Sequence, residues 1–180
     1  MSFHDVGTLH AVLAQAVAAI VLGLLGASGI AKLVDPEPTT GAMRVAGLPA
    51  SNFVSRLLGL TEVCVAVLAL AVGGIAVVAG AVLYIGFAVF TFSAVKNRIP
   101  LQSCGCFGRE DTPPTAFHVG FNVLAALALI ALVPLALDPI DWSMPLNEMG
   151  AFLAFTGIGV YLSYLLLTLL PRLQTAWRAP

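Results

Sequence analysis

The sequence contains very little charge, with eight Lys or Arg residues and nine Asp or Glu residues in a chain of 180. Soluble domains carry about 25% charged residues, whereas 9% are charged here, 59% are hydrophobic, and the mean hydropathy is +1.00. This composition excludes a soluble globular domain and predicts an integral membrane protein of the lipid bilayer. The net charge of -1 and the lack of a basic cluster also exclude nucleic acid as a partner, because phosphate binding needs grouped Lys and Arg.

Cysteine is scarce as well, and three cysteines cannot form the disulfide framework of a small secreted domain. Two of them, Cys104 and Cys106, lie in one polar loop with the sequence LQSCGCFG, between two long apolar runs. This Cys-X-Cys pair is therefore interpreted as a reactive or metal-binding site. The third, Cys64, is two residues from Glu62, so the two side chains point to nearly opposite faces of a helix. We interpret Cys64 as a small apolar residue.

The long apolar runs predict an all-α membrane protein, since a spanning helix needs about 20 apolar residues. Gly73 and Gly74 divide a run that is too long for one helix, and predict a tight helical hairpin. The first run is too long for a signal-peptide core and has no basic leader, so we expect it to remain uncleaved. The last is expected to stop at Pro171. We predict one transmembrane domain, residues 1–180, with spans at residues 10–32, 56–73, 75–95, 116–137 and 148–170.

Small and helix-breaking residues give further expectations about the connections and the packing. Residues 34–55 contain Pro36, Pro38 and Pro49 and are expected to form a polar connection. Glycines at intervals of three in the first span, at positions 23, 26 and 29, predict close approach of a neighbouring helix. Thr112, followed by two prolines, is the expected cap of the fourth span.

The basic residues predict the orientation in the membrane. With five spans, all eight fall on one side, while the other side holds acidic residues and the Gly73-Gly74 turn. By the positive-inside rule, the amino terminus lies outside, and the Cys-X-Cys loop and the carboxyl terminus are cytoplasmic. The expected location is a bacterial-type inner membrane. The basic residues are Lys32, Arg44, Arg56, Lys96, Arg98, Arg109, Arg172 and Arg178.

Several polar residues are expected in the cytoplasmic leaflet, close to the cysteine loop. Glu62 is predicted about 9 Å inside the second span, at 1.5 Å per residue, and an intramembrane carboxylate is a functional hypothesis by default. The hypothesis favoured here is a structural ion pair with Lys32. His118 and Asn122 are four residues apart, so they share a helix face. His118 is expected either to support the cysteines or to donate a hydrogen bond to a backbone carbonyl.

The cysteine pair has chemistry suited to thiol-disulfide exchange. A disulfide between Cys104 and Cys106 would close a very small ring, and such strained bonds exchange readily. Arg98, Arg109, His118 and the start of the fourth span favour the reactive thiolate. Two alternatives are an inert buried turn and a Cu(I) site, which thiolates select but which would lack a methionine cluster here. No motif for any other cofactor is present.

The CGCFG loop, together with single residues on the apolar helices before and after it, resembles the MauE methylamine-utilisation membrane proteins. These are related to the DoxX-like four-helix membrane proteins. The resemblance covers about residues 10–137 and leaves the fifth span outside it. Phe121 stands where an arginine is expected in the family. The residues that carry the resemblance are Gly29, Lys32, Asp35-Pro36, Gly47-Leu48-Pro49, Glu62, Cys104-Gly105-Cys106-Phe107-Gly108 and Asn122.

This resemblance implies a DoxX-like four-helix bundle with a fifth, C-terminal helix, and a redox-associated function. The protein would work with a thioredoxin-like partner and help an exported client, such as methylamine dehydrogenase, acquire its disulfides. Cys104 and Cys106 would be the redox pair, supported by Glu62, His118 and Asn122. An exported client conflicts with a cytoplasmic loop, unless the protein passes electrons across the bilayer, serves a cytoplasmic partner, or has the opposite orientation. The alternative function is a non-catalytic accessory subunit or assembly factor of a larger, respiratory-type membrane complex.

Overall fold

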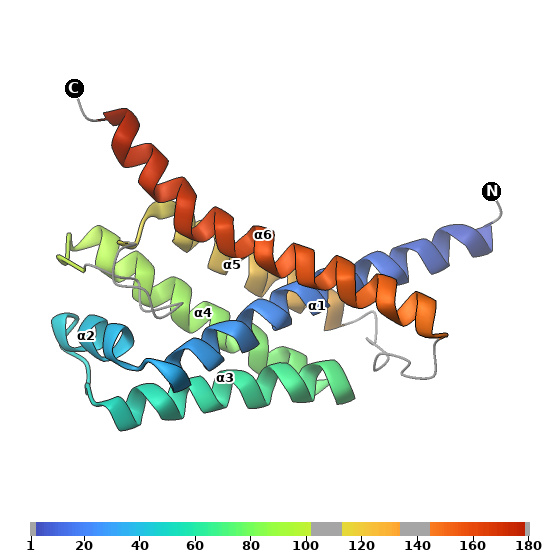
Figure 1. Cartoon of the computed structure of the whole chain (residues 1–180), viewed down its shortest axis with the longest axis horizontal. Coiled ribbons are helices and arrows are strands. Elements are labelled where there is room, and N and C mark those ends of the chain that lie inside the picture. Colours follow the sequence, from blue (N-terminus) through green and yellow to red (C-terminus); the bar gives the residue numbers. More distant parts are fainter. Residues whose placement is uncertain (1–2, 102–112, 134–144, 179–180) are drawn as a thin grey trace.

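The computed structural model describes residues 3–101, 113–133 and 145–178, and within these ranges every regular element is a helix. Side chains are described for residues 13–101, 113–133 and 145–169. Figure 1 shows the helices packed lengthwise around α1. The elements are α1 (Phe3–Val34), α2 (Glu37–Val45), α3 (Asn52–Val72), α4 (Ile75–Lys96), α5 (Ala116–Leu132) and α6 (Leu146–Arg178).

Four of the described helices are long and apolar enough to cross a membrane. These segments are Leu13–Val34 in α1, Asn52–Val72 in α3, Ile75–Lys96 in α4 and Leu146–Leu169 in α6. The fourth predicted span is described as the shorter apolar helix Ala116–Leu132. The prediction of an all-helical membrane protein is therefore confirmed for the described residues, with four candidate spans. The count of five remains a prediction.

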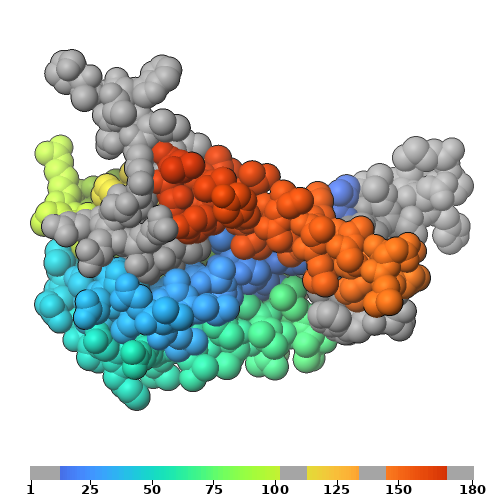
Figure 2. Space-filling model, in the orientation of Figure 1, coloured from blue at the N-terminus to red at the C-terminus, as the bar shows by residue number. Residues whose placement is uncertain are grey.

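The core of the bundle forms where α1 lies against the other long helices. Leu22 and Leu25 of α1, Val77 of α4 and Leu129 of α5 are each no more than 1% exposed and belong to one apolar cluster. α3 and α4 form the predicted hairpin, since Gly73 and Gly74 both have positive φ angles, of 69° and 56°. α6 crosses the face shown in Figure 2 and leaves most of its own apolar surface uncovered, as expected for a helix in lipid.

The backbones of α1 and α3 approach each other closely at a pair of glycines. A Cβ atom on Gly29 would lie 2.5 Å from the Gly59 carbonyl oxygen, and one on Gly59 would lie 2.6 Å from the Gly29 carbonyl oxygen. Both distances are shorter than a carbon–oxygen contact allows, so only glycine permits this approach. The predicted close approach along the first span is confirmed, because Gly26 also faces Ala66 of α3 and Gly23 faces Val160 of α6.

The connection between the first two spans differs from its prediction, because residues 37–45 form the short helix α2. The prolines do not prevent it, since Pro36 caps the helix and Pro38 lies in its first turn, where no backbone donor is needed. The Thr40 hydroxyl group fixes α2 to α3, at 2.8 Å from Ser55 Oγ and 3.0 Å from Asn52 Oδ1. α2 buries Thr39, Thr40 and Ala42 against the bundle.

Two predicted helix limits were wrong by about one turn or more, and the cap of a third helix was misassigned although its predicted start, residue 116, is confirmed. α3 begins at Asn52 rather than at position 56, because the Ser51 hydroxyl group accepts a hydrogen bond from the Val54 amide and caps it. α5 begins at Ala116 with Thr115, not Thr112, as its cap. α6 continues through Pro171 to Arg178, since a proline removes only one backbone donor and is tolerated in membrane helices.

The contact between Gly29 and Gly59 predicts an unusual result for an alanine substitution. Gly59→Ala should lower the free energy of unfolding by about 1–3 kcal/mol through overpacking, although alanine favours helix by about 1 kcal/mol. The measurement is unfolding of the purified full chain in detergent. Gly157→Ala in α6 is the matched control, because no atom lies within 4 Å of its Cβ position. Equal stability of the two variants would contradict the close contact.

Candidate functional site

The close approach of α1 and α3 places a buried ion pair between them. Lys32 Nζ lies 3.0 Å from Glu62 Oε2, and the two side chains are 2% and 0% exposed. The positions follow from the glycine contact, since each charged residue lies three residues beyond a glycine and on the same helix face (Gly29 and Lys32, Gly59 and Glu62). The predicted pairing of Lys32 with Glu62 is confirmed.

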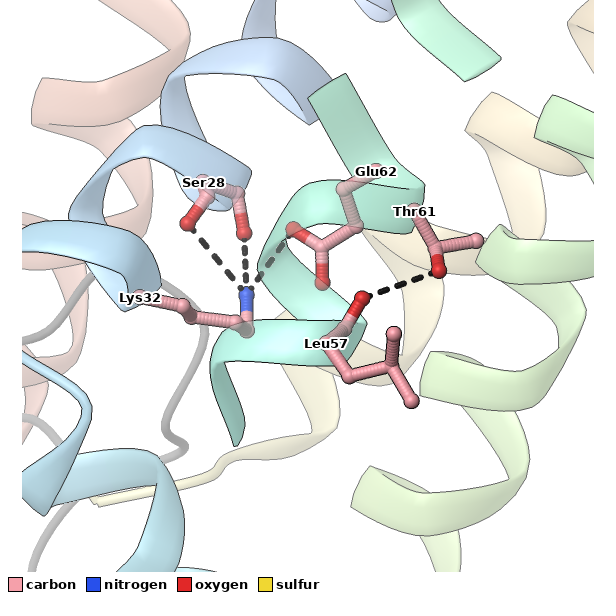
Figure 3. Close-up of polar contacts among 5 residues, drawn as sticks. All are labelled: Ser28, Lys32, Leu57, Thr61 and Glu62. Atoms are coloured by element: carbon pink, nitrogen blue, oxygen red, sulfur yellow. Dashed lines mark hydrogen bonds and ion pairs between the residues drawn. The ribbon is translucent and has the colours of Figure 1, made fainter. Parts of the chain in front are cut away.

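The ammonium group of Lys32 is surrounded by acceptors. Besides Glu62, Nζ donates to the Ser28 hydroxyl oxygen at 2.6 Å, and the Ser28 carbonyl oxygen lies at 3.5 Å (Figure 3). Nζ also lies 5.4 Å from the centre of the Phe87 ring of α4, a cation–π distance. The charge of Lys32 is therefore compensated from α1, α3 and α4 at once.

Glu62 uses one of its two carboxylate oxygens within the described chain. Oε2 accepts from Lys32, while Oε1 is buried and has no hydrogen-bond partner among the described residues. Glu62 lies ten residues after the start of α3, about 15 Å along the helix. The prediction of 9 Å was too small because α3 starts earlier. A buried carboxylate with an unused oxygen retains the capacity to accept a further hydrogen bond.

His118 caps the start of α5, and its Nδ1 atom acts as a hydrogen-bond acceptor there. The Thr115 amide donates to His118 Nδ1 at 3.2 Å, and the Thr115 hydroxyl oxygen lies 3.0 Å from the same nitrogen. Because a backbone amide can only donate, Nδ1 carries no proton, and a neutral ring then has its proton on Nε2. Nδ1 thus accepts from a backbone amide, and donation from His118 to a backbone carbonyl remains a prediction for Nε2.

A narrow pocket brings polar residues of three helices together. His118 and Asn122 of α5 are 2% and 6% exposed, and they line this pocket with Ser28 of α1 and Tyr84 of α4. Tyr84 also donates from its hydroxyl group to the Val21 carbonyl oxygen at 2.7 Å. The predicted shared face of His118 and Asn122 is confirmed. Since Ser28 also binds Lys32, the pocket and the ion pair form one continuous polar site.

The remaining predicted residues lie apart from this site or outside the described residues. Arg98 follows α4, is exposed, and has a φ angle of 50°, in the left-handed region. Cys64 is exposed on α3 while Glu62 is buried, which confirms that the two face opposite sides. Cys104 and Cys106 lie outside the described residues, and so does the earlier cap prediction, Thr112. Within the described ranges no three His, Cys, Asp or Glu side chains form a metal site.

Sequence reasoning missed several residues of the site, among them Ser28 and Thr115. Ser28 precedes Lys32 by four residues, so the helical period already places both on one face. Thr115 was hidden by the two prolines before it, which made Thr112 look like the cap. The signal for Thr115 is its spacing, because a cap residue and the third residue of its helix contact each other.

The comparison with protein families decides to which group this membrane protein belongs. The family model described as methylamine utilisation protein MauE matches residues 10–137, about two thirds of the chain. The chain belongs to the MauE family. Comparison with curated proteins and with solved structures finds no match. Membership in the MauE family implies a role in methylamine utilisation. The matched range includes every polar residue of the site, while α6, which contributes Leu167 to the pocket wall, lies beyond it.

The buried ion pair predicts strong coupling between Lys32 and Glu62. Lys32→Leu or Glu62→Leu alone should lower the free energy of unfolding by about 3–5 kcal/mol, because each leaves an unpaired buried charge. The double variant should lose much less than either single variant, since a hydrophobic pair replaces the ion pair. The measurement is a double-mutant cycle on the full chain in detergent.

The control for this cycle is Glu148→Leu, because Glu148 of α6 is exposed. Its stability should match that of the wild type within about 0.5 kcal/mol, as for most surface substitutions. Additive losses in the double variant would show that Lys32 and Glu62 do not stabilise each other.

Proposed function

We propose that this MauE-family protein is a membrane thiol-disulfide oxidoreductase, or a redox accessory protein, that uses Cys104 and Cys106 for exchange with a thioredoxin-like partner. In the family context, the exchange supports maturation of another protein of methylamine utilisation, of the methylamine dehydrogenase type. The observation that carries this proposal is the buried polar site beside the start of α5. Residues 97–115 join α4 to α5, and this segment contains both cysteines.

The residues flanking the cysteine segment support a reactive thiolate. His118 lies in the first turn of α5, and the amino-terminal end of a helix stabilises negative charge. Arg98, at the other end of the segment, adds a positive charge. Lys32, Glu62 and Asn122 are proposed as supporting residues, which hold α1, α3 and α5 in place beside the start of α5, where the segment ends. The redox-active group is the cysteine pair itself. In the alternative, the two thiolates bind a Cu(I) ion.

The exchange proceeds through a mixed disulfide. A thiolate of Cys104 or Cys106 attacks one sulfur of a partner disulfide, the partner bond breaks, and the second partner sulfur leaves as a thiolate. The remaining loop cysteine then attacks the mixed disulfide, which releases the reduced partner and leaves a Cys104–Cys106 disulfide. The reverse sequence oxidises a client dithiol and returns two loop thiols. Oxidative maturation of a client uses this reverse direction.

The proposed orientation places the cysteine segment on the cytoplasmic side of a bacterial-type inner membrane, with the amino terminus outside. Figure 1 supports a common side, because α2, the end of α4 and the end of α6 lie at one end of the bundle, opposite the amino terminus. Arg44 lies in the last turn of α2 and Lys96 in the last turn of α4. The positive-inside rule assigns such an end to the cytoplasm.

Replacement of either loop cysteine tests the exchange chemistry. Cys104→Ser and Cys106→Ser should each lower the rate of disulfide exchange with a thioredoxin-like protein by roughly 100-fold or more, because a hydroxyl group does not form a thiolate-like nucleophile. The rate is followed by trapping of the mixed disulfide and by quantifying partner thiols. Cys64→Ala is the control, because Cys64 lies on the opposite face of α3 from Glu62. Exchange that survives in both serine variants would refute the proposed mechanism.

Thiol labelling in intact cells tests the orientation. In a Cys64→Ala background, a membrane-impermeant thiol reagent should label the loop cysteines only after lysis, because the predicted loop is cytoplasmic. Comparison with and without prior reduction then shows whether the pair is oxidised in a reducing compartment. Labelling of intact cells would reverse the orientation and place the exchange on the side of an exported client.

The second candidate function is a non-catalytic accessory subunit or assembly factor of a larger, respiratory-type membrane complex. It is favoured by α6, which lies outside the family match and whose apolar segment is largely uncovered. A helix of this kind can pack against a neighbouring membrane protein. Purification in mild detergent distinguishes the two functions, since a stoichiometric partner retained by the cysteine variants favours the accessory function.

A further inference from the structure

Two of the cavities in the bundle lie close to Lys32, and they differ in the polar groups on their walls. The larger one, between α1, α2, α3 and α4, has apolar walls apart from Lys32 and one threonine. Lys32 already donates to Glu62 and Ser28, so it does not need an occupant of that cavity as a partner. The polar pocket beside the start of α5 is different, because His118 and Asn122 line it and both are more than nine-tenths buried.

His118 presents a hydrogen-bond donor that has no acceptor among the described residues. The Thr115 amide donates to Nδ1 at 3.2 Å, so the proton of the neutral ring is on Nε2. The hydrogen bonds of the ring with described residues both involve Nδ1. Buried polar atoms in proteins are nearly always paired, either with protein groups or with ordered water, because an unpaired one costs free energy. The Nε2–H group therefore needs an acceptor beside it.

The side-chain amide of Asn122 adds further unmet hydrogen bonds. It has two donor hydrogens and an acceptor oxygen, and none of them bonds to another described residue. Asn122 is 6% exposed and lies one turn beyond His118, so the helical period places both residues on the side of α5 that lines the pocket. An occupant that both accepts and donates hydrogen bonds would satisfy the two side chains together.

The size and the charges of the pocket narrow the choice of occupant. The pocket is narrow, with room for roughly one molecule of the size of water. A cation would lie near the ammonium group of Lys32, whose Nζ is 2.6 Å from the hydroxyl oxygen of the wall residue Ser28. An anion would lose its hydration without meeting a net positive charge, because Glu62 compensates Lys32. A water molecule is neutral and both accepts and donates.

We propose that the polar pocket binds one ordered water molecule, which accepts a hydrogen bond from His118 Nε2 and bonds to the side-chain amide of Asn122. Ser28 of α1 lines the same pocket and supplies a third contact, since buried waters typically make about three hydrogen bonds. The water then joins the first turns of α5 to the helix that carries Lys32. This site does not depend on the proposed thiol exchange, because none of its ligands is a cysteine.

A crystal structure of the full chain, grown in a lipidic mesophase and resolved well enough to show ordered water, tests the site directly. A single peak should lie about 2.7–3.2 Å from both His118 Nε2 and an amide atom of Asn122. A pocket without a peak, or a backbone carbonyl bonded to Nε2, would overturn the proposal. Crystals soaked in bromide test for an anion, and an anomalous peak in the pocket would equally overturn it.

Nuclear magnetic resonance of the full chain in phospholipid nanodiscs gives a second test. In a His4→Gln/His10→Gln background His118 is the one histidine left, so a nitrogen label on histidine reports on this ring alone. Magnetisation should pass from water to the Nε2 proton, and Asn122→Leu should lose most of this transfer, because leucine removes a ligand and fills the space. Val123→Leu is the matched control, since Val123 of α5 is exposed and lies outside the pocket. Equal transfer in the Asn122→Leu variant and its parent would refute the site.

Discussion

The contact between Gly29 and Gly59 determines how the rest of the bundle is built. Two helix backbones that approach this closely leave no room for lipid or water between them. Lys32 and Glu62 are therefore both shielded from the surroundings of the bundle. Separation of the pair would expose a charge to a medium of low dielectric constant, which costs several kcal/mol. α1 and α3 are thus held in one register by the shape of the glycine contact and by the need for the charges to meet.

This register also fixes the polar groups that are farther from the glycines. Lys32 orients Ser28 one turn below it, and Ser28 lies in the pocket wall beside His118, Asn122 and Tyr84. α5 has its first turn at this pocket because Thr115 and His118 cap it there. The proposed redox segment joins α4 to α5. Lys32 contacts Phe87 of α4, and its partner Ser28 shares a pocket with α5, so a disturbance of Lys32 or Glu62 is expected to reach the segment through these two helices.

The sequence predicted the features that depend on local pattern. Long apolar runs, the Gly73-Gly74 turn, the spacing of glycines in α1 and the opposite faces of Glu62 and Cys64 all follow from helix period and composition. The helix α2 was missed because Pro36 and Pro38 were treated as breakers, although at a helix start they lose no hydrogen bond. Phe87 could not be assigned to the Lys32 environment from sequence alone, because which aromatic side chain lies against a buried charge depends on the packing of α4 beside α1.

Two cavities lie close to Lys32, one lined by its partner Ser28 and the other by Lys32 itself, and Phe87 lines both. The polar pocket of His118 and Asn122 adjoins the helix that follows the cysteine segment, and the apolar cavity opens beside α4. Lys32 touches Ser28 in one and lines the other. The ion pair that holds α1 to α3 thus contacts the polar pocket through Ser28 and the apolar cavity through Lys32, so the shape of both depends on the register set by Gly29 and Gly59.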